Sequence, residues 1–231
     1  MADTARLAVL IDADNTTHGA TAELLAEVAK FGTPTIKRAY GDWTTPGLVG
    51  WRRELLRHAI QPVQQFAYTR GKNATDSALI IDAMDLLYAD NVDGFVIASS
   101  DSDFTRLATR LRESGKTVYG IGNRDTPEAF VKACDRFIYL DLLGAEPPKV
   151  AQRRDPVLER LLRPAITGTA KVDGWAALSA VGGYLSARNP GFDTRSYGYA
   201  KLGELVRAQP YVDVREVGEP PGPTQLWVQL R

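Results

Sequence analysis

The chain has 231 residues, of which 44% are hydrophobic and 24% are charged, and its 28 basic and 28 acidic side chains give a formal net charge of zero. This is the composition of an ordinary soluble protein, and the length suits one substantial domain followed by a small one. The sequence contains no apolar stretch long enough to cross a bilayer and no signal pattern at its N-terminus. We therefore expect a cytoplasmic protein with no membrane partner.

Cysteine and histidine are scarce, which limits the kinds of site that the chain can form. Cys134 is the single cysteine, so an intrachain disulfide is excluded, and His18 and His58 are the only histidines. A zinc site of His and Cys ligands is not expected. Charge is uneven along the chain: residues 1–150 hold 17 basic against 20 acidic residues, a net −3, and residues 151–231 hold 11 against 8, a net +3. This asymmetry permits a nucleic-acid partner for the second part.

The first part of the chain alternates apolar runs with amphipathic segments. The expected strands are 7–11, 35–40, 62–67, 95–98, 117–121 and 136–140. The expected helices are 20–31, 48–58, 75–88 and 126–132, with a further one that begins at Phe104 and ends at Gly115. Strands that alternate with helices over short turns indicate an α/β fold with a parallel sheet covered on both faces.

A change of composition after residue 142 predicts a second domain. Gly144 and the pair Pro147-Pro148 are typical of a linker, which we assign to 143–154, between domains at 1–142 and 155–231. The second domain is expected to have helices at 155–166, from about 173, and at about 194–208, followed by strands at 211–217 and 226–230. Three helices and a two-stranded wing describe a small winged helix-turn-helix domain.

Acidic side chains follow two of the predicted strands. Asp12 ends the first strand, and Asp101 and Asp103 follow the strand at 95–98. Because the carboxyl ends of parallel strands face one crevice, these acids are expected to converge, together with Asp76, which heads an otherwise apolar face of the helix at 75–88. Crowded carboxylates need a balancing charge, most simply a divalent cation such as Mg²⁺. The alternative at this point is that Asp101 and Asp103 only cap the helix that follows them.

Four converging carboxylates suit metal-assisted hydrolysis of a phosphodiester. A bound metal lowers the pKa of its water and neutralises charge in the transition state. Asn15 either orients water or phosphate or serves only as a turn residue. Basic and aromatic side chains are expected around the mouth of the site, where they would contact a single strand of RNA. The candidates for these contacts are Tyr40, Trp43, Arg52, Arg53, Arg70 and Lys72.

Three stretches in combination resemble the NYN domains, LabA-like members of the PIN-like nuclease superfamily. They are Asp12-Ala-Asp-Asn15, Lys72-Asn-Ala-Thr-Asp76 and Ser-Ser-Asp101-Ser-Asp103-Phe104, and the resemblance covers about residues 5–141. It implies a three-layer α/β/α sandwich and a ribonuclease that depends on Mg²⁺ or Mn²⁺. The metal ligands implied are Asp12, Asp76, Asp101 and Asp103, with Asn15 in a supporting role. Ser100 and Asn73 depart from the pattern, since relatives often have glycine at both positions.

The last part of the chain, about residues 153–231, is similar to OST-HTH/LOTUS domains. Phe192 and the run Tyr197-Gly-Tyr-Ala-Lys-Leu202 carry the likeness. Such domains bind RNA or protein partners. The residues expected to take part in recognition are Arg195, Tyr197, Tyr199 and Lys201.

The hypothesis from the sequence is a metal-dependent ribonuclease whose winged helix selects RNA or a protein partner. One alternative is a haloacid-dehalogenase-like phosphatase with Asp12 as the nucleophile, since Asp12-Ala-Asp-Asn-Thr16 resembles the first motif of that family. Another is an RNA-binding adaptor with no activity. A dinucleotide-binding domain is excluded, because the first turn lacks the glycine fingerprint. The RNA that is cut, endonuclease or exonuclease action, activity on DNA, the number of metals and the oligomeric state stay open.

Overall fold

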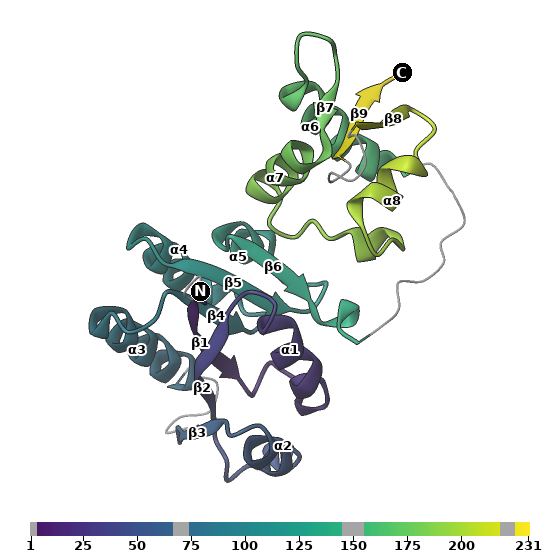
Figure 1. The fold of residues 1–231 in the computed structure, drawn as a ribbon. Coiled ribbons are helices and arrows are strands. Elements are labelled where there is room, and N and C mark those ends of the chain that lie inside the picture. Colours follow the sequence, from purple (N-terminus) through teal and green to yellow (C-terminus); the bar gives the residue numbers. More distant parts are fainter. Residues whose placement is uncertain (1–3, 67–73, 145–154, 218–224) are drawn as a thin grey trace. The chain divides into compact units, whose positions relative to one another are not determined.

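The structure, a computed structural model, describes residues 4–66, 74–144, 155–217 and 225–231 (Figure 1). The chain divides into two compact units, Met1–Gly144 and Ala145–Arg231. Most of the predicted linker lies outside the described residues, as do Arg70 and Lys72. Within the described residues, no helix is both long and apolar enough to span a membrane.

The first unit is built on a six-stranded parallel sheet in the order β3-β2-β1-β4-β5-β6. The strands are β1 (Arg6–Asp12), β2 (Thr33–Gly41), β3 (Gln61–Gln64), β4 (Gly94–Ala98), β5 (Thr117–Gly122) and β6 (Arg136–Tyr139). The two central strands, β1 and β4, are continuous apolar runs in the sequence. A strand has such a sequence when both faces of its sheet are covered.

Helices cover both faces of this sheet (Figure 1). They are α1 (Thr21–Val28), α2 (Trp51–Arg57), α3 (Ala74–Ala89), α4 (Thr105–Glu113) and α5 (Glu128–Ala133). Leu10 and Ile97 pack with α3, α4 and α5 on one face, whereas Val9 and Val96 pack with α1 and α2 on the other. Alternate residues of each strand therefore pack into the two hydrophobic cores on opposite faces of the sheet. The predicted three-layer α/β/α sandwich is confirmed.

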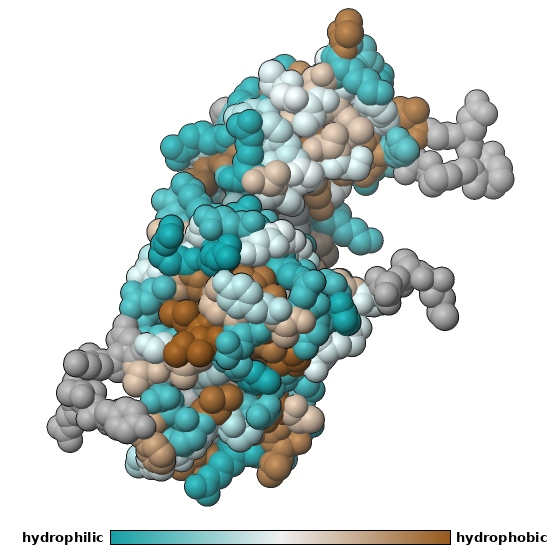
Figure 2. All heavy atoms as spheres, turned by 90° about the vertical axis from the view of Figure 1, so that its left-hand side faces the viewer, coloured by the Kyte–Doolittle hydropathy of each residue, from teal (hydrophilic) through white to brown (hydrophobic). Residues whose placement is uncertain are grey.

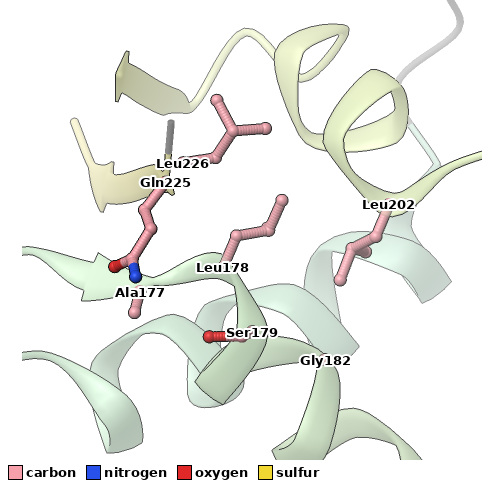
Figure 3. A pocket seen from close by; sticks show the side chains of 7 residues that line it. All are labelled: Ala177, Leu178, Ser179, Gly182, Leu202, Gln225 and Leu226. Carbon is pink, nitrogen blue, oxygen red and sulfur yellow. The ribbon is translucent and has the colours of Figure 1, made fainter. Parts of the chain in front are cut away.

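The second unit packs three helices against a small antiparallel sheet. Its elements are α6 (Pro156–Thr169), β7 (Ala176–Ala177), α7 (Leu178–Arg188), a 3₁₀ turn (Thr194–Tyr197), α8 (Leu202–Arg207), β8 (Val212–Val217) and β9 (Gln225–Leu230). Leu162, Leu185, Leu205 and Val228 are among the buried side chains of its core. An open hollow of about 520 Å³, lined mainly by apolar side chains, lies between the start of α7, α8 and β9 (Figure 3).

The structure corrects two predictions for this unit. The second helix begins at Leu178, and Trp175 precedes a short strand, β7, so the wing sheet has three strands in the order β7-β9-β8. The predicted third helix is split into the 3₁₀ turn and α8, because Gly198 adopts φ +83°, a left-handed conformation that ends the turn. Tyr199 and Lys201 therefore lie in the connection between these two elements.

The surface is mixed in character. Figure 2 shows hydrophobic patches separated by hydrophilic side chains on the face that it presents. Among the described residues of the first unit, Leu56, Ile81 and Tyr88 are large hydrophobic side chains that are well exposed. Scattered exposure of this kind is normal for a folded domain.

Candidate metal centre

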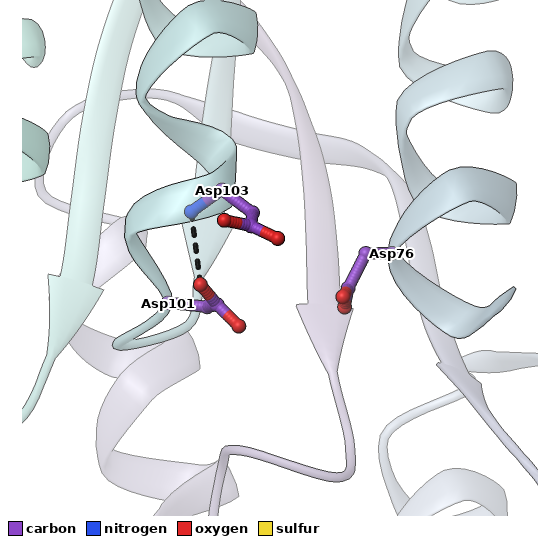
Figure 4. A group of neighbouring side chains, drawn as sticks. All are labelled: Asp76, Asp101 and Asp103. Carbon is purple, nitrogen blue, oxygen red and sulfur yellow. Dashed lines mark hydrogen bonds between the residues drawn. The ribbon is translucent and has the colours of Figure 1, made fainter. Parts of the chain in front are cut away.

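The acids that the sequence singles out come from three elements at one edge of the sheet. Asp12 is the last residue of β1, Asp76 lies in the first turn of α3, and Asp101 and Asp103 follow β4. Asp76, Asp101 and Asp103 each offer a carboxylate oxygen that lies within 4.8 Å of the other two (Figure 4). Figure 4 shows the side chain of Asp76 directed from α3 toward the other two acids.

Asp12 lies in the floor of the site. Its side chain is fully buried and accepts hydrogen bonds from Asn15 Nδ2 at 2.7 Å, Ser99 Oγ at 2.8 Å and the backbone N–H of Asp14 at 3.2 Å. Burial raises the pKa of Asp12 above its usual value, and the hydrogen bonds from Asn15 and Ser99 oppose that rise. Asn15 therefore acts on Asp12 directly, in addition to standing in a turn.

Ser99 links the ends of the two central strands, a role that the sequence analysis did not assign. Its buried hydroxyl donates to Asp12 and accepts the backbone N–H of Asp101 at 3.1 Å. The signal in the sequence was a serine between a buried strand and an acidic turn, where a buried hydroxyl needs partners. The neighbouring Ser100 accepts the backbone N–H of Asn123 at 2.9 Å, so it braces the same turn against the end of β5.

Asp101 combines the two roles that the sequence left as alternatives. Its Oδ1 atom accepts the backbone N–H of Asp103 at 2.9 Å, and it is the N-cap of the 3₁₀ turn Ser102–Phe104 that leads into α4 (Figure 4). The same carboxylate belongs to the group with Asp76 and Asp103. Capping fixes the orientation of the Asp101 carboxylate, so the capping role is compatible with its place in the group of acids.

Asp14 is a further acid near the site that the sequence analysis did not choose as a site residue. Its side chain is exposed, and its Oδ2 atom accepts the hydroxyl of Thr75 at 3.0 Å. This bond ties the loop after β1 to the start of α3, one residue before Asp76. A polar hollow of about 320 Å³, lined in part by Asp14, Thr17 and Thr45, opens beside this loop.

Burial and neighbouring negative charges act together on Asp76. The residue is 9% exposed, and burial, followed by repulsion from Asp12, Asp101 and Asp103, raises its pKa to about 6. The charged groups that act most strongly on Asp76 are all acidic. Hard divalent cations prefer carboxylate oxygens, and oxygens bound to one Mg²⁺ at about 2.1 Å lie roughly 3–4 Å apart. Small rotations of the three side chains would reach that spacing, so the residues fit such a cation.

The residues expected to contact RNA in the first unit have different surroundings. Arg52 and Arg53 are exposed on α2. The Trp43 side chain is half-buried, and its Nε1 atom donates to the carbonyl of Val63 at 3.0 Å. Tyr40 is fully buried and its hydroxyl donates to Asp82, so the expectation that it stacks on a base was wrong. The register of β2 turns this ring into the core.

The four residues of the second unit that were predicted to take part in recognition also differ in exposure. Arg195 pairs with the buried Asp193, with 2.7 Å between Nη2 and Oδ2. Tyr197 and Tyr199 are half-buried and pack against the core of the unit, whereas Lys201 is exposed. Their part in recognition stays a prediction.

Two known domain families and a solved structure match this chain. The model of the NYN domain matches residues 6–141, and that of the OST-HTH/LOTUS domain matches 150–223. A crystal structure of a protein of unknown function from Vibrio parahaemolyticus has a TM-score of 0.52 and 17% identity, over 60% of this chain and 94% of that one. This likeness shows the fold alone.

Two solution structures match a smaller part of the chain. An uncharacterized protein from Nitrosomonas europaea is 28% identical over 38% of this chain and 87% of that one, with a TM-score of 0.31. A protein from Chromobacterium violaceum is 32% identical over 37% and 87%, with a TM-score of 0.28. Among curated proteins, none matches the chain. The parallel sandwich and the two family matches together show that this chain belongs to the NYN family of the PIN-like nuclease superfamily and carries an OST-HTH/LOTUS domain.

Proposed function

We propose that the protein is a metal-dependent ribonuclease, with Asp12, Asp76, Asp101 and Asp103 as the ligands of Mg²⁺ or Mn²⁺. The observation that carries the proposal is the grouping of Asp76, Asp101 and Asp103, with their oxygens within 4.8 Å of one another, in a chain whose family is PIN-like. When bound, a divalent cation supplies positive charge near the scissile phosphate and makes water more acidic.

The chain's own residues would orient the site. Asn15 and Ser99 hold the carboxylate of Asp12 through its Oδ2 atom, and Ser99 also fixes the backbone of Asp101. Residues that orient ligands in this way typically change metal affinity or activity by about 10- to 100-fold when they are removed. The polar hollow beside Asp14 would give a flanking nucleotide of the substrate room next to the acids.

The OST-HTH/LOTUS domain supports RNA as the substrate, because its family suggests RNA binding. In this proposal it increases the affinity for RNA, while the acids of the first unit cut it. Whether it also takes a protein partner is a separate expectation.

The phosphatase alternative is not favoured by the grouping of the other acids. A phosphatase with Asp12 as its nucleophile would give no role to Asp76, which offers a carboxylate oxygen within 4.8 Å of oxygens of Asp101 and Asp103. The adaptor alternative predicts binding of RNA without cleavage, so an activity assay separates the two.

The test is cleavage of a 5′-labelled single-stranded RNA by the full chain with Mg²⁺, with Mn²⁺ and with EDTA. We expect cleavage with either metal and none with EDTA. Asp101→Asn should lower the rate at least about 100-fold, because it removes a carboxylate that would hold the cation beside the reacting phosphate. Asp141→Asn, which removes an exposed acid paired with Arg124, should retain the parental rate and serves as the control.

Folding of Asp101→Asn is expected to be intact, since the change relieves repulsion within the cluster. Its circular dichroism should match that of the parent. RNA binding by the parent without cleavage under all conditions would contradict the proposal and favour the adaptor. Release of phosphate from p-nitrophenyl phosphate, with RNA left whole, would favour the phosphatase.

A further inference from the structure

The wing sheet of the second unit has one covered face and one outward face. Val212 and Val228 are buried in the core of the unit, so the residues that alternate with them point the other way. On this outward face, Arg215 of β8 lies directly opposite Trp227 of β9, and Ala177 of β7 lies opposite the same Trp227. A large aromatic side chain thus stands at the centre of the face that the core does not cover.

A tight turn places a second indole ring beside this face. The backbone N–H of Lys171 donates to the carbonyl of Trp175 at 2.9 Å, and that of Gly174 donates to the carbonyl of Lys171 at 2.9 Å. Gly174 has φ +80°, in the left-handed region that residues other than glycine rarely adopt. Glycine therefore favours this turn, which lies beside Gln229 of β9.

Four side chains on this face alternate cations with aromatic rings, and we call them the wing ladder: Trp175, Arg215, Trp227 and Lys171. The guanidinium carbon of Arg215 is 4.1 Å from the ring centre of Trp175 and 5.9 Å from that of Trp227. Lys171 Nζ is 4.5 Å from the ring centre of Trp227. Each ring has a cation within the range of a cation–π contact.

Arg215 forms an ion pair with Asp173, and this pair is exposed to solvent. Arg215 Nη2 lies 3.1 Å from Asp173 Oδ2, and the two side chains are 42% and 54% exposed. An ion pair as exposed as this contributes about 0–1 kcal/mol, so a phosphate can displace the carboxylate at little cost. Arg195 differs, because its pair with Asp193 leaves the side chains only 19% and 7% exposed.

We infer that the wing ladder is a binding surface for single-stranded RNA, with phosphates on Arg215 and Lys171 and bases stacked against the two half-buried indole rings. The inference rests on the proposed function, because it takes RNA as the substrate. Aromatic platforms interleaved with cations are the means by which proteins hold single strands without sequence preference. A protein surface that covered the ladder would have to bury both cations and supply its own acids, whereas the RNA backbone brings a negative charge with every nucleotide.

The test is binding of a fluorescein-labelled 12-nucleotide single-stranded RNA to the full chain in EDTA, followed by anisotropy at several salt concentrations. The double variant Lys171→Gln with Arg215→Gln should raise Kd about tenfold, and the loss of two phosphate contacts should reduce the log–log salt slope by about 1.4. The matched control is Arg160→Gln with Arg188→Gln, which removes two exposed cations from α6 and α7. It should change Kd by less than about twofold.

Stacking has its own readout. RNA should quench tryptophan fluorescence of the parent, and Trp175→Phe with Trp227→Phe should remove most of the quenching, while Trp43 and Trp51 remain. Equal melting temperatures of parent and variants would show that the unit is folded. An unchanged Kd and slope in the ladder variant, an equal loss in the control, or no binding by the parent would overturn the inference. Binding is measured in EDTA, so its result does not depend on whether the protein cleaves RNA. If the parent cleaves RNA with metal but the ladder variant binds RNA as well as the parent does, the role of the wing ladder is overturned and the proposed ribonuclease function is not.

Discussion

Helix α3 carries two acids with opposite surroundings, and the difference separates an acid that supports the fold from one that is available to a ligand. Asp82 accepts hydrogen bonds from Arg38 and from the hydroxyl of Tyr40. Asp76, six residues earlier, has other carboxylates as its strongest electrostatic neighbours. Both side chains lie largely out of solvent, so each charge needs compensation.

The chain supplies that compensation at Asp82. Burial alone would lower the pKa of Arg38, but the hydrogen bond and the charge of Asp82 outweigh it and raise that pKa. Burial, followed by the hydrogen bond to Asp82, raises the pKa of Tyr40 far above its usual value, so its hydroxyl remains a donor. At Asp76 the same helix presents a charge that a cation from outside would balance. Repulsion between carboxylates that no cation of the chain balances therefore distinguishes Asp76 from Asp82.

The largest effect on stability is expected from Asp82→Asn. The change leaves the guanidinium of Arg38, which is only 25% exposed, without its ionic partner, and should lower the free energy of unfolding by about 3 kcal/mol. Urea denaturation measures this. Asp85→Asn removes an exposed acid from the same helix and should change stability by less than about 0.5 kcal/mol. Equal stability of the two variants would show that the contacts of Asp82 with Arg38 and Tyr40 do not stabilise the fold.

Asp76→Asn should act in the opposite direction. Without metal at pH 7, loss of the crowded charge should raise the free energy of unfolding by about 2 kcal/mol. Because the pKa of Asp76 is raised to about 6 in the folded chain, the folded state binds more protons than the unfolded state between about pH 4 and pH 6. The parent should therefore lose stability as pH rises through this window, relative to Asp76→Asn, and the difference should be constant above it.

Urea denaturation of parent and variant from pH 4 to pH 8 in EDTA measures this difference. A difference that shrinks with rising pH would show that Asp76 is stabilised as a carboxylate by the chain itself. In that case Asp76, like Asp82, would have its charge balanced within the chain, and no cation from outside would be needed.

The sequence was sufficient to predict the α/β/α sandwich of the first unit and the grouping of Asp76 with Asp101 and Asp103. Two apolar runs that end in acid predict buried strands with acids at one edge of the sheet. In the structure these strands, β1 and β4, are adjacent. An acid at the head of an apolar helix face predicts a position near the same edge, which is where Asp76 lies. Hydrophobic patterning decides these features, and patterning is visible in a single sequence.

The contacts that tune the site could not be predicted in the same way. The bond between Ser99 and Asp12 depends on the register of β1 and β4, and the pairing of Asp82 with Tyr40 depends on how α3 packs over β2. The pattern of a strand shows which of its side chains share a face. It does not show which residue lies opposite on the next strand, nor where a helix packs over the sheet. The missed strand β7 has only two residues, too few for a periodicity, whereas Gly198 was a visible signal that the predicted third helix is interrupted.

The most direct test of the central claim is calorimetric titration of Mn²⁺ into the full chain, the double variant Asp76→Asn with Asp101→Asn, and Asp85→Asn. If the crowded carboxylates hold a divalent cation, the parent and Asp85→Asn will bind Mn²⁺ with the same saturable heat, and the double variant will show none. Equal binding by all three proteins, or no binding by the parent, would contradict the account.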